Sequence, residues 1–290
     1  MEGINVLSLF DGMSCGQIAL ERAGIKVKNY FASEIDEYAI KITQKNYRDT
    51  IQIGDVAKVD GFGFPKIDLL MGGSPCQSFS NIGDGSGFDG KSKLFFEFIR
   101  ILDEVKPKYF LLENVVMKKE WQDKISELVG CEPIKINSDI FSAQNRPRLY
   151  WTNIPNVALP KSKNLVISSV INPKFSDDYP NYLDMEFSGK KRKDLLRTVD
   201  QTARCLTATM YKGQVTSFCK SIFGDVYRYT PEDCEALQTV PKGYTEGVSN
   251  TQRYKMLGNG WTVDVIAHIF KHIWIPENPL LKEDIFTKVT

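Results

Sequence analysis

Histidine, a common ligand of metal ions, is scarce in this sequence of 290 residues. Its two histidines, His268 and His272, lack the acidic partner of an HExxH motif, so a surface or helix-capping role is favoured over a metal site. Its six cysteines contain no CxxC pair. Scattered cysteines argue against a zinc site or a disulfide framework and suit a reducing compartment. We therefore expect a cytoplasmic protein without a bound metal.

Long apolar runs are also missing. No run approaches the ~20 residues that span a bilayer, and residues 1–5 lack the basic segment that begins a signal peptide. The GxGxxG pattern of dinucleotide-binding folds is absent too, which disfavours a nicotinamide-dependent oxidoreductase. With 42% hydrophobic and 25% charged residues, the chain has the composition of an ordinary globular protein with one large domain, or with a large and a small one.

Short apolar runs alternate with helical segments through the first half of the chain. A strand at residues 5–10, a glycine-bearing turn at 11–16 and a helix at 17–23 form the opening of a nucleotide-type βαβ unit. Further strands are predicted at residues 29–33, 50–53, 67–71, 109–112, 133–136 and 148–153, and further helices at 36–46, 94–104 and 119–128. This alternation predicts an α/β fold with a doubly wound sheet.

Ionisable side chains follow the predicted strands. Asp11, Glu34, Asp55 and Glu113 each come after the end of a strand, where open α/β sheets keep their ligand crevice. Each carboxylate alone could cap a helix or lie in solvent, and Asp36 suits the N-cap of its helix better than Glu34 does. Four carboxylates at the same end of successive strands favour a binding site.

Two further features have both a structural and a functional interpretation. Cys76 begins a long loop rich in glycine and serine; a lone cysteine is more often buried and structural, but a loop such as 81–93 within a compact domain is usually functional. Arg146 and Arg148 flank a proline. They could hold an anion or a carbonyl oxygen bidentately, or they could form a surface salt-bridge pair.

The chain changes character near residue 157, where prolines and basic residues become frequent. Residues 157–222 contain 11 Lys and Arg against 6 Asp and Glu, a balance of +5 that leaves −4 for the remainder. A basic segment on a slightly acidic body indicates contact with a polyanion, with a solvated face as the alternative. We predict a large domain from residues 1–156 and 255–275, a small domain from 157–254, and a C-terminal tail at 276–290.

Two signals mark the last helices. Thr230 is followed by Pro231 and two acidic residues, which is a strong helix start. The glycine-containing segment 257–261 is predicted as a turn before a final amphipathic helix at 263–273.

Five short motifs stand in order along the chain: Leu9-Phe10-Asp11-Gly12, Pro75-Cys76-Gln77, Glu113-Asn114-Val115, Gln144-x-Arg146-x-Arg148 and Gly258-Asn259. Together they resemble the motifs of the S-adenosylmethionine-dependent DNA cytosine-5 methyltransferases. Segments 8–12, 94–98 and 151–155 are similar to the catalytic domain of the animal de novo enzymes, whereas Pro-Cys-Gln and the lack of a reader domain suit a stand-alone bacterial or phage enzyme. The resemblance implies a class I methyltransferase fold, with a Rossmann-like, mostly parallel seven-stranded sheet and a small inserted target-recognition domain.

The resemblance also implies catalytic roles. Cys76 would be the thiolate that adds to cytosine C6, and Glu113 would hydrogen-bond or protonate the base at N3. Arg148, with Arg146 beside it, would bind the O2 side of the base and order the loop. Because a stacked base is out of reach inside duplex DNA, the cytosine would have to flip out.

Binding residues are carried over position by position. Those expected to contact S-adenosyl-L-methionine are Phe10, Asp11, Gly12, Glu34, Ile35, Asp55, Val56, Pro75, Leu94, Asn259, Gly260 and Trp261. Gly260 departs from the serine common at its position. Those expected to contact double-stranded DNA are Ser80, Ile82 (as an apolar wedge), Lys190, Lys191, Arg192, Lys193, Arg204, Tyr211, Lys212 and Gln214.

Two other functions stay open. One branch of the same family modifies tRNA, but Arg204-Cys205-Leu206-Thr207 stands where that branch has Cys-Phe-Thr. A catalytically inactive paralogue that only binds DNA or a partner enzyme would have lost the nucleophile or the acid, and Cys76 and Glu113 are both present. The motifs specify neither the base order of a recognition site, nor a restriction-modification or orphan context, nor the choice between monomer and homodimer.

Overall fold

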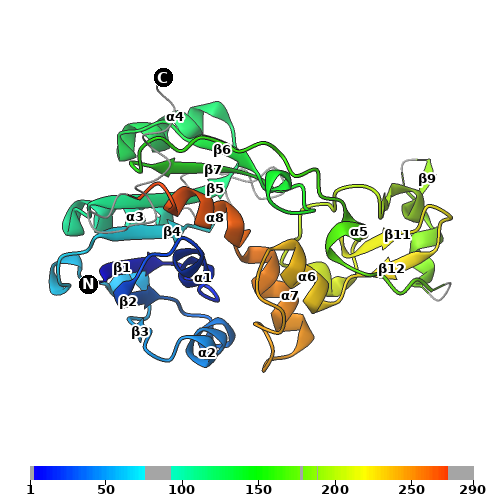
Figure 1. Cartoon of the computed structure of the whole chain (residues 1–290), viewed down its shortest axis with the longest axis horizontal. Coiled ribbons are helices and arrows are strands. Elements are labelled where there is room, and N and C mark those ends of the chain that lie inside the picture. The colour runs from blue at the N-terminus through cyan, green and yellow to red at the C-terminus, as the bar shows by residue number, and fades with distance from the viewer. Residues whose placement is uncertain (1–2, 76–92, 177–178, 188, 274–290) are drawn as a thin grey trace, which may run out of the picture.

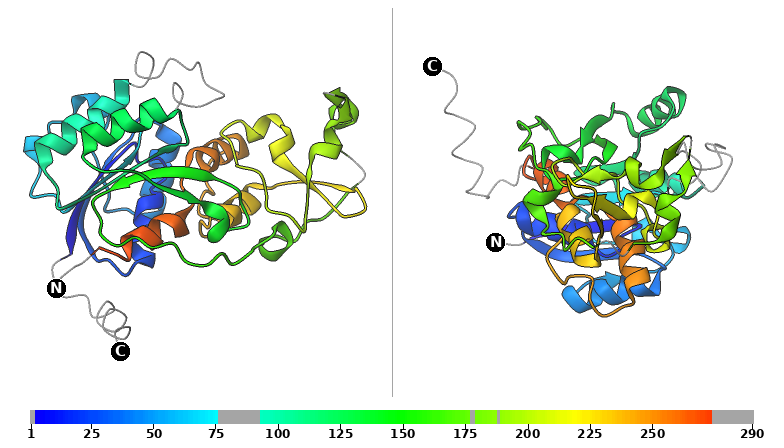
Figure 2. Two further views of the ribbon diagram at one scale, coloured as in Figure 1. Left: turned by 90° about the horizontal axis from the view of Figure 1, so that it is seen from above. Right: turned by 90° about the vertical axis from the view of Figure 1, so that its right-hand side faces the viewer.

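The computed structural model describes residues 3–75, 93–176, 179–187 and 189–273. A seven-stranded sheet forms the centre of a large domain, and a small three-stranded sheet lies at the other end of the molecule (Figure 1 and Figure 2). The predicted site residues Cys76, Ser80 and Ile82 lie outside the described residues.

The large sheet has the strand order β3-β2-β1-β4-β5-β7-β6, and β7 runs antiparallel to both of its neighbours. Its strands are β1 (Ile4–Leu9), β2 (Val27–Ser33), β3 (Ile51–Gln52), β4 (Leu69–Gly73), β5 (Tyr109–Val115), β6 (Ile134–Asn137) and β7 (Pro147–Thr152). The predicted α/β fold with a mostly parallel sheet is confirmed. The order reverses between β1 and β4, so a ligand crevice is expected beside these two strands.

Helices cover both faces of the large sheet, because alternate residues of a strand point to opposite faces. Val6 and Met71 pack in one core with α1, α2 and α8, whereas Leu7 and Leu70 pack in another with α3 and α4. These helices are α1 (Cys15–Arg22), α2 (Glu37–Asn46), α3 (Lys93–Val105), α4 (Lys119–Val129) and α8 (Val263–Phe270).

The small sheet has its own core, formed by Leu183, Leu196, Phe218 and Val226. Two helices, α6 and α7, lie between this sheet and the large domain (Figure 1). The remaining elements are α5 (Ile167–Val170), β8 (Glu186–Phe187), β9 (Lys190–Lys191), β10 (Arg197–Thr198), β11 (Phe218–Lys220), β12 (Val226–Arg228), α6 (Pro231–Leu237) and α7 (Asn250–Asn259). Within the described ranges, no helix has the length and apolar character needed to cross a membrane.

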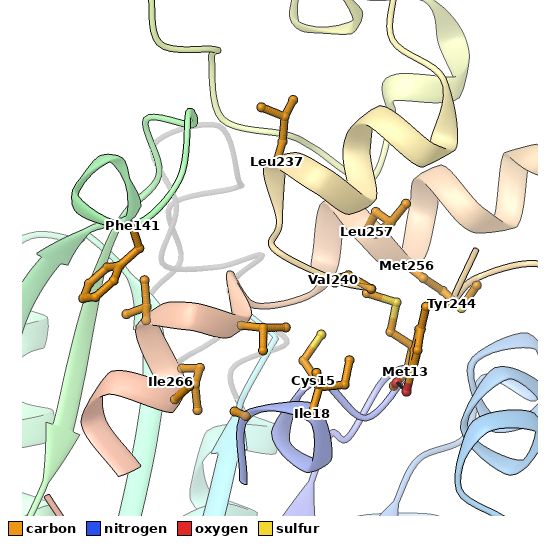
Figure 3. Packing of buried hydrophobic residues seen from close by; sticks show 14 of the residues in the cluster. Met13, Cys15, Ile18, Phe141, Leu237, Val240, Tyr244, Met256, Leu257 and Ile266 are labelled. Atoms are coloured by element: carbon orange, nitrogen blue, oxygen red, sulfur yellow. Dashed lines mark hydrogen bonds between the residues drawn. The ribbon is translucent and has the colours of Figure 1, made fainter. Parts of the chain in front are cut away.

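The junction between α6, α7 and the large domain is a continuous hydrophobic core (Figure 3). Met256 and Leu237 belong to the same buried cluster as Met13 and Cys15 at the start of α1. The Tyr244 hydroxyl donates a hydrogen bond to the Met13 carbonyl at 2.7 Å. The chain therefore returns from the small sheet to the turn between β1 and α1 in the large domain. The domain boundary between residues 254 and 255 stays a prediction.

Two predicted helix starts agree with the structure. At the start of α2, the Asp36 carboxylate accepts hydrogen bonds from the backbone N–H groups of Tyr38 and Ala39. At the start of α6, Thr230 and Asp233 form a reciprocal capping box, with Pro231 at the first helical position. Both caps depend on residues a few positions apart, so the local sequence is sufficient to specify them.

The strand predicted to stop before its two glycines continues through them. Gly72 and Gly73 pair with β5 as part of β4. A Cβ atom at Gly72 would lie 3.0 Å from the Leu9 carbonyl oxygen, so a neighbouring strand, and not a turn, favours glycine there. Strand β5 also continues to Val115, so Glu113 lies within a strand and not after it.

The turn predicted at residues 257–261 is wrong in its first half, because the helix α7 ends only at Asn259. A Cβ atom at Gly258 would lie 2.1 Å from the carbonyl carbon of Thr207. Glycine is therefore required where α7 touches another backbone segment, which a pattern of neighbouring residues does not reveal. The final helix is also shorter than predicted and ends at Phe270.

Candidate active site

A cavity of about 360 Å³ lies at the carboxyl ends of β1, β2, β4 and β5. The proposed acid and both arginines, Glu113, Arg146 and Arg148, line it. Eight of the residues predicted to bind the cofactor line it as well: Phe10, Asp11, Gly12, Glu34, Pro75, Asn259, Gly260 and Trp261. The structure thus brings together motifs that are as far apart in the chain as residues 10 and 261.

Four residues predicted to bind the cofactor do not line this cavity. Asp55 caps a short 3₁₀ helix, and its Oδ1 accepts a hydrogen bond from Ala57 N at 3.0 Å. Val56 is buried in the core beneath α3, and Leu94 packs against the same core. Ile35 is 75% exposed. Cofactor contacts by these four side chains stay predictions.

The turn after β1 has an uncommon backbone conformation. Phe10 has φ +57° and Gly12 has φ +60°, a region that side chains such as phenylalanine seldom adopt. Glu34 holds this turn, because its Oε2 accepts from Gly12 N at 2.8 Å while its Oε1 accepts from the backbone N–H groups of Ile35 and Asp36 at 2.7 and 2.8 Å. Glu34 therefore links the turns after β1 and β2.

The Asp11 carboxylate is held by two hydroxyl groups. It accepts hydrogen bonds from Tyr30, at 2.6 Å, and from Ser14. Loss of hydration in these surroundings raises the pKa of Asp11 to about 6, despite the hydrogen bonds that oppose the shift. A carboxyl group that changes charge near pH 6 thus lies in the cavity wall.

Both oxygens of the Glu113 carboxylate have donors. Arg148 Nε lies 2.9 Å from Oε1, and Trp261 Nε1 donates to Oε2 at 3.1 Å. Glu113 is 8% exposed. Burial opposes the charge of Arg148, but the Glu113 carboxylate beside it raises the pKa of this arginine. An ion pair with little solvent access is therefore present at the carboxyl end of β5.

Arg146 is 4% exposed, so the interpretation as a surface salt-bridge residue is wrong for it. Its guanidinium group donates to the carbonyl oxygens of Leu206, Gly258 and Gly260 at 2.9–3.1 Å and to Cys205 Sγ at 3.3 Å. Arg146 thereby binds the small domain and the end of α7 to the cavity.

Sequence reasoning missed Gln238, which is fully buried beside Gln144. Its Nε2 donates to the carbonyl oxygens of Leu257 and Gly260, and its Oε1 accepts from Gln144 Nε2 at 3.0 Å. It lies 94 positions from Gln144, so no local spacing marks the pair. The only sequence signal is a polar residue directly after the apolar end of a predicted helix.

A family model for C-5 cytosine-specific DNA methylases matches residues 4–214 and 188–274. The chain belongs to this family. Its members transfer a methyl group to cytosine, and the family and the fold imply S-adenosyl-L-methionine as the methyl donor. The predicted family and enzyme class are confirmed.

Relatives of this DNA methylase chain extend over most of its length. Type II methyltransferase M1.ScrFI from Lactococcus lactis subsp. cremoris is 29% identical over 300 residues, covering 91% of this chain and 76% of that protein. Type II methyltransferase M.NlaX from Neisseria lactamica is 27% identical over 296 residues, covering 91% and 94%. The solved structure of the Entamoeba histolytica methyltransferase EhMeth has the same fold, with a TM-score of 0.72 over 94% of this chain and 98% of that one, at 20% identity.

The DNA methylase chain has a second, larger cleft, of about 600 Å³, in the small domain. Four of the residues predicted to contact DNA line this basic cleft: Arg192, Arg204, Lys212 and Gln214. Tyr211 is adjacent in sequence and 37% exposed. Three other basic residues predicted to contact DNA, Lys190, Lys191 and Lys193, are not among the residues that line the cleft. Lys193 forms an ion pair with Asp184 at 2.8 Å.

The two histidines bond to backbone groups. His268 Nε2 lies 2.7 Å from the Ala158 carbonyl oxygen, and His272 Nδ1 lies 2.9 Å from the His268 carbonyl oxygen. Among the residues that the structure describes, no group of three or more His, Cys, Asp or Glu side chains is placed to hold a metal ion.

Gly260, which replaces the common serine, faces a crowded neighbourhood. A Cβ atom there would lie 3.1 Å from Met13 Cε and 3.3 Å from Cys15 Sγ. A side chain at position 260 would therefore require the Met256 carbonyl oxygen and the Met13 and Cys15 side chains to give way by a few tenths of an ångström.

Proposed function

We propose that the protein transfers a methyl group from S-adenosyl-L-methionine to C5 of a flipped-out cytosine in duplex DNA. The observation that carries this proposal is the Glu113–Arg148 ion pair in the wall of a cavity that Pro75 also lines. Cys76, the proposed nucleophile, is the next residue after Pro75 in the sequence.

The proposed chemistry solves a specific problem, which is that C5 of cytosine is a poor nucleophile. The Cys76 thiolate adds to C6 and forms an S–C6 bond, while Glu113 hydrogen-bonds or protonates N3 to balance the charge that develops on the ring. C5 would then take the methyl group as the bond between that methyl and the cofactor sulfur breaks, which would leave S-adenosylhomocysteine as the neutral thioether product. A water or hydroxide removes the C5 proton, the S–C6 bond breaks, and the thiolate is regenerated.

Three of the other five cysteines are less suited to this role. Cys15, Cys219 and Cys234 are buried, and loss of hydration raises the pKa values of Cys15 and Cys219 to about 12. Since the thiolate is the nucleophile, a thiol with so high a pKa is almost fully protonated at neutral pH. This supports Cys76, although its side chain lies outside the described residues.

The cavity fits the proposed cofactor. Its volume of about 360 Å³ is that of a small-molecule site. Phe10 and Trp261 supply aromatic surfaces and Asp11 a carboxyl group, which suit a sulfonium and an ammonium cation. When bound, S-adenosyl-L-methionine supplies an electrophilic methyl group. Asn259 and Gly260 would close over its methionine end.

The basic cleft supports a nucleic acid partner. We propose that Arg192, Arg204 and Lys212 contact phosphates, that Gln214 and Tyr211 lie toward the groove, and that Lys190 and Lys191 add a distal contact. Ser80 and Ile82 are proposed to occupy the gap left by the flipped base. The description of the matching family model, C-5 cytosine-specific DNA methylase, favours DNA over tRNA as the substrate.

One assay tests the proposed function. The protein is incubated with S-adenosyl-L-methionine labelled on its methyl group and with either duplex DNA or tRNA. We expect labelled 5-methylcytosine in DNA. Cys76→Ala should abolish it, whereas Cys131→Ala, which changes a half-buried cysteine outside the cavity, should retain it. Label in tRNA alone would replace duplex DNA as the substrate, and no label in either would favour a non-catalytic binding protein.

A further inference from the structure

The indole of Trp261 has a contact that a cofactor wall does not require. Its Nε1–H group donates to Glu113 Oε2 at 3.1 Å, while Arg148 holds the other oxygen at 2.9 Å. The carboxylate is thus held from two sides, by a residue of β7 and by a residue from the segment after α7. Two donors at fixed positions leave the carboxylate plane little freedom to rotate.

The segment that carries Trp261 is itself fixed. The carbonyl oxygen of the preceding Gly260 accepts from Arg146 Nη2 at 2.9 Å and from Gln238 Nε2 at 3.2 Å. On the other side, Thr262 is buried and its hydroxyl donates to Gln238 Oε1 at 2.7 Å. The backbone on both sides of the indole therefore depends on Gln238, and Arg146 adds a charged donor.

Gly73 leaves a space beside the hydrogen bond between Trp261 and Glu113. Gly73 of β4 pairs with Glu113 of β5. A Cβ atom at Gly73 would lie 2.8 Å from Glu113 Oε2 and 2.9 Å from Trp261 Nε1, too close to both bonded atoms. Any other residue at position 73 would displace the indole, the carboxylate or both.

We propose that Trp261 is a positioning residue for Glu113, and that Gly73 is glycine because the bond between them needs its space. This inference rests on the proposed function, in which Glu113 acts at N3 of the cytosine. It gives Trp261 a role in addition to that of lining the cofactor cavity. The wall of the cofactor cavity and the group that acts on the base are then parts of one hydrogen-bonded unit.

Trp261→Phe tests the proposal, because it keeps an aromatic ring and removes the N–H donor. In single turnovers at saturating DNA and cofactor, we expect methyl transfer to slow about 10-fold, the effect of one hydrogen bond to a charged group. The dissociation constant of S-adenosyl-L-methionine should stay within about twofold. Trp121→Phe on α4, outside the cavity, is the matched control and should keep the wild-type rate.

A double-mutant cycle separates positioning from a loss of packing. Gly73→Ala should also slow methyl transfer. Its effect should be smaller in the Trp261→Phe background, because phenylalanine leaves room for the added methyl group. A wild-type rate for Trp261→Phe would overturn the proposal.

A spectroscopic readout keeps this inference separate from the proposed function. The indole N–H resonance of Trp261, assigned by its loss in Trp261→Phe, should shift in Glu113→Gln. If the wild-type protein methylates no nucleic acid, the proposed function fails, and this resonance still decides the contact. A resonance that ignores Glu113→Gln would overturn the positioning role.

Discussion

Asp11, in the wall of the cofactor cavity, makes the stability of the folded protein depend on pH. An ordinary aspartate has a pKa near 4, and the folded protein raises the pKa of Asp11 to about 6. The folded protein therefore binds this proton more tightly than the unfolded chain does. The contribution of this group to stability falls as pH rises from about 4 to about 6, and it is constant above that range.

Asp11→Asn should remove this dependence. We expect the free energy of unfolding of the variant, taken relative to the wild type, to increase as pH rises from 4 to 6 and then to level off. Urea unfolding at several pH values between 4 and 7.5 measures it. A difference between the two proteins that is constant across this range would contradict the raised pKa.

At the scale of residues, sequence reasoning identified Glu113, Arg148 and the Asp11 turn because short motifs mark them. It did not identify Gln238 or Cys205, whose partners Gln144 and Arg146 lie 94 and 59 positions away. Their contacts arise only when the fold brings the segment before β7 against the end of α6 and against the loop that carries Cys205. A polar residue without a local partner gives no sign of the buried network it joins.

At the scale of elements, the helix α7 depends on close backbone contact. Its Gly258 lies against the backbone of Thr207 and Ala208, at distances that leave no room for a Cβ atom. Arg146 then bridges the carbonyl oxygens at the end of this helix. The packing of α7 therefore controls the position of the residues that close the cavity.

Gly258→Ala should force α7 away from this segment. We expect a loss of about 1–3 kcal/mol in the free energy of unfolding, because an added methyl group in a packed site shifts the backbone. Chemical denaturation measures the loss. Gly63→Ala is the matched control, since a Cβ atom there meets nothing within 4 Å, and it should change stability by no more than about 0.5 kcal/mol.

Element ends show which parts of the fold the sequence could predict. The starts of α2 and α6 were predictable because Asp36 and Thr230 cap N–H groups two or three residues away. The ends of β4 and α7 were not, because Gly73 and Gly258 are required by segments distant in the chain. Glycine was interpreted as a turn residue at both places, whereas tertiary contact decides its role.

At the scale of the whole molecule, positive charge gathers in the basic cleft of the small domain. The cations that line it come from 3₁₀ turns and loops between residues 192 and 212. This agrees with the excess of basic residues in 157–222. The charge pattern predicted a polyanion-binding segment, but its concentration into one cleft depends on how the loops pack.

Lys212→Ala should weaken binding to duplex DNA and reduce the steepness of its salt dependence. If Lys212 contacts a phosphate, the slope of log K against log salt concentration should fall by about 1. Fluorescence anisotropy with a labelled duplex, at salt concentrations from about 50 to about 200 mM, measures this slope. Lys41→Ala on the exposed face of α2 should leave the slope unchanged, and equal slopes for both variants would remove Lys212 from the DNA contact.

The packing of α8 against α1 also bears on how the protein is made. Arg22 of α1 pairs with Asp264 of α8 at 2.7 Å, and Ile18 shares a core with Ile266. At about 5–20 residues per second, a ribosome needs roughly 10–50 s to make the stretch that separates these two helices. During this time the part of α1 that packs on α8 lacks its partner. This apolar surface of the nascent chain is thus exposed to aggregation until α8 has been synthesised, and chaperones that bind apolar segments have a defined interval in which to act.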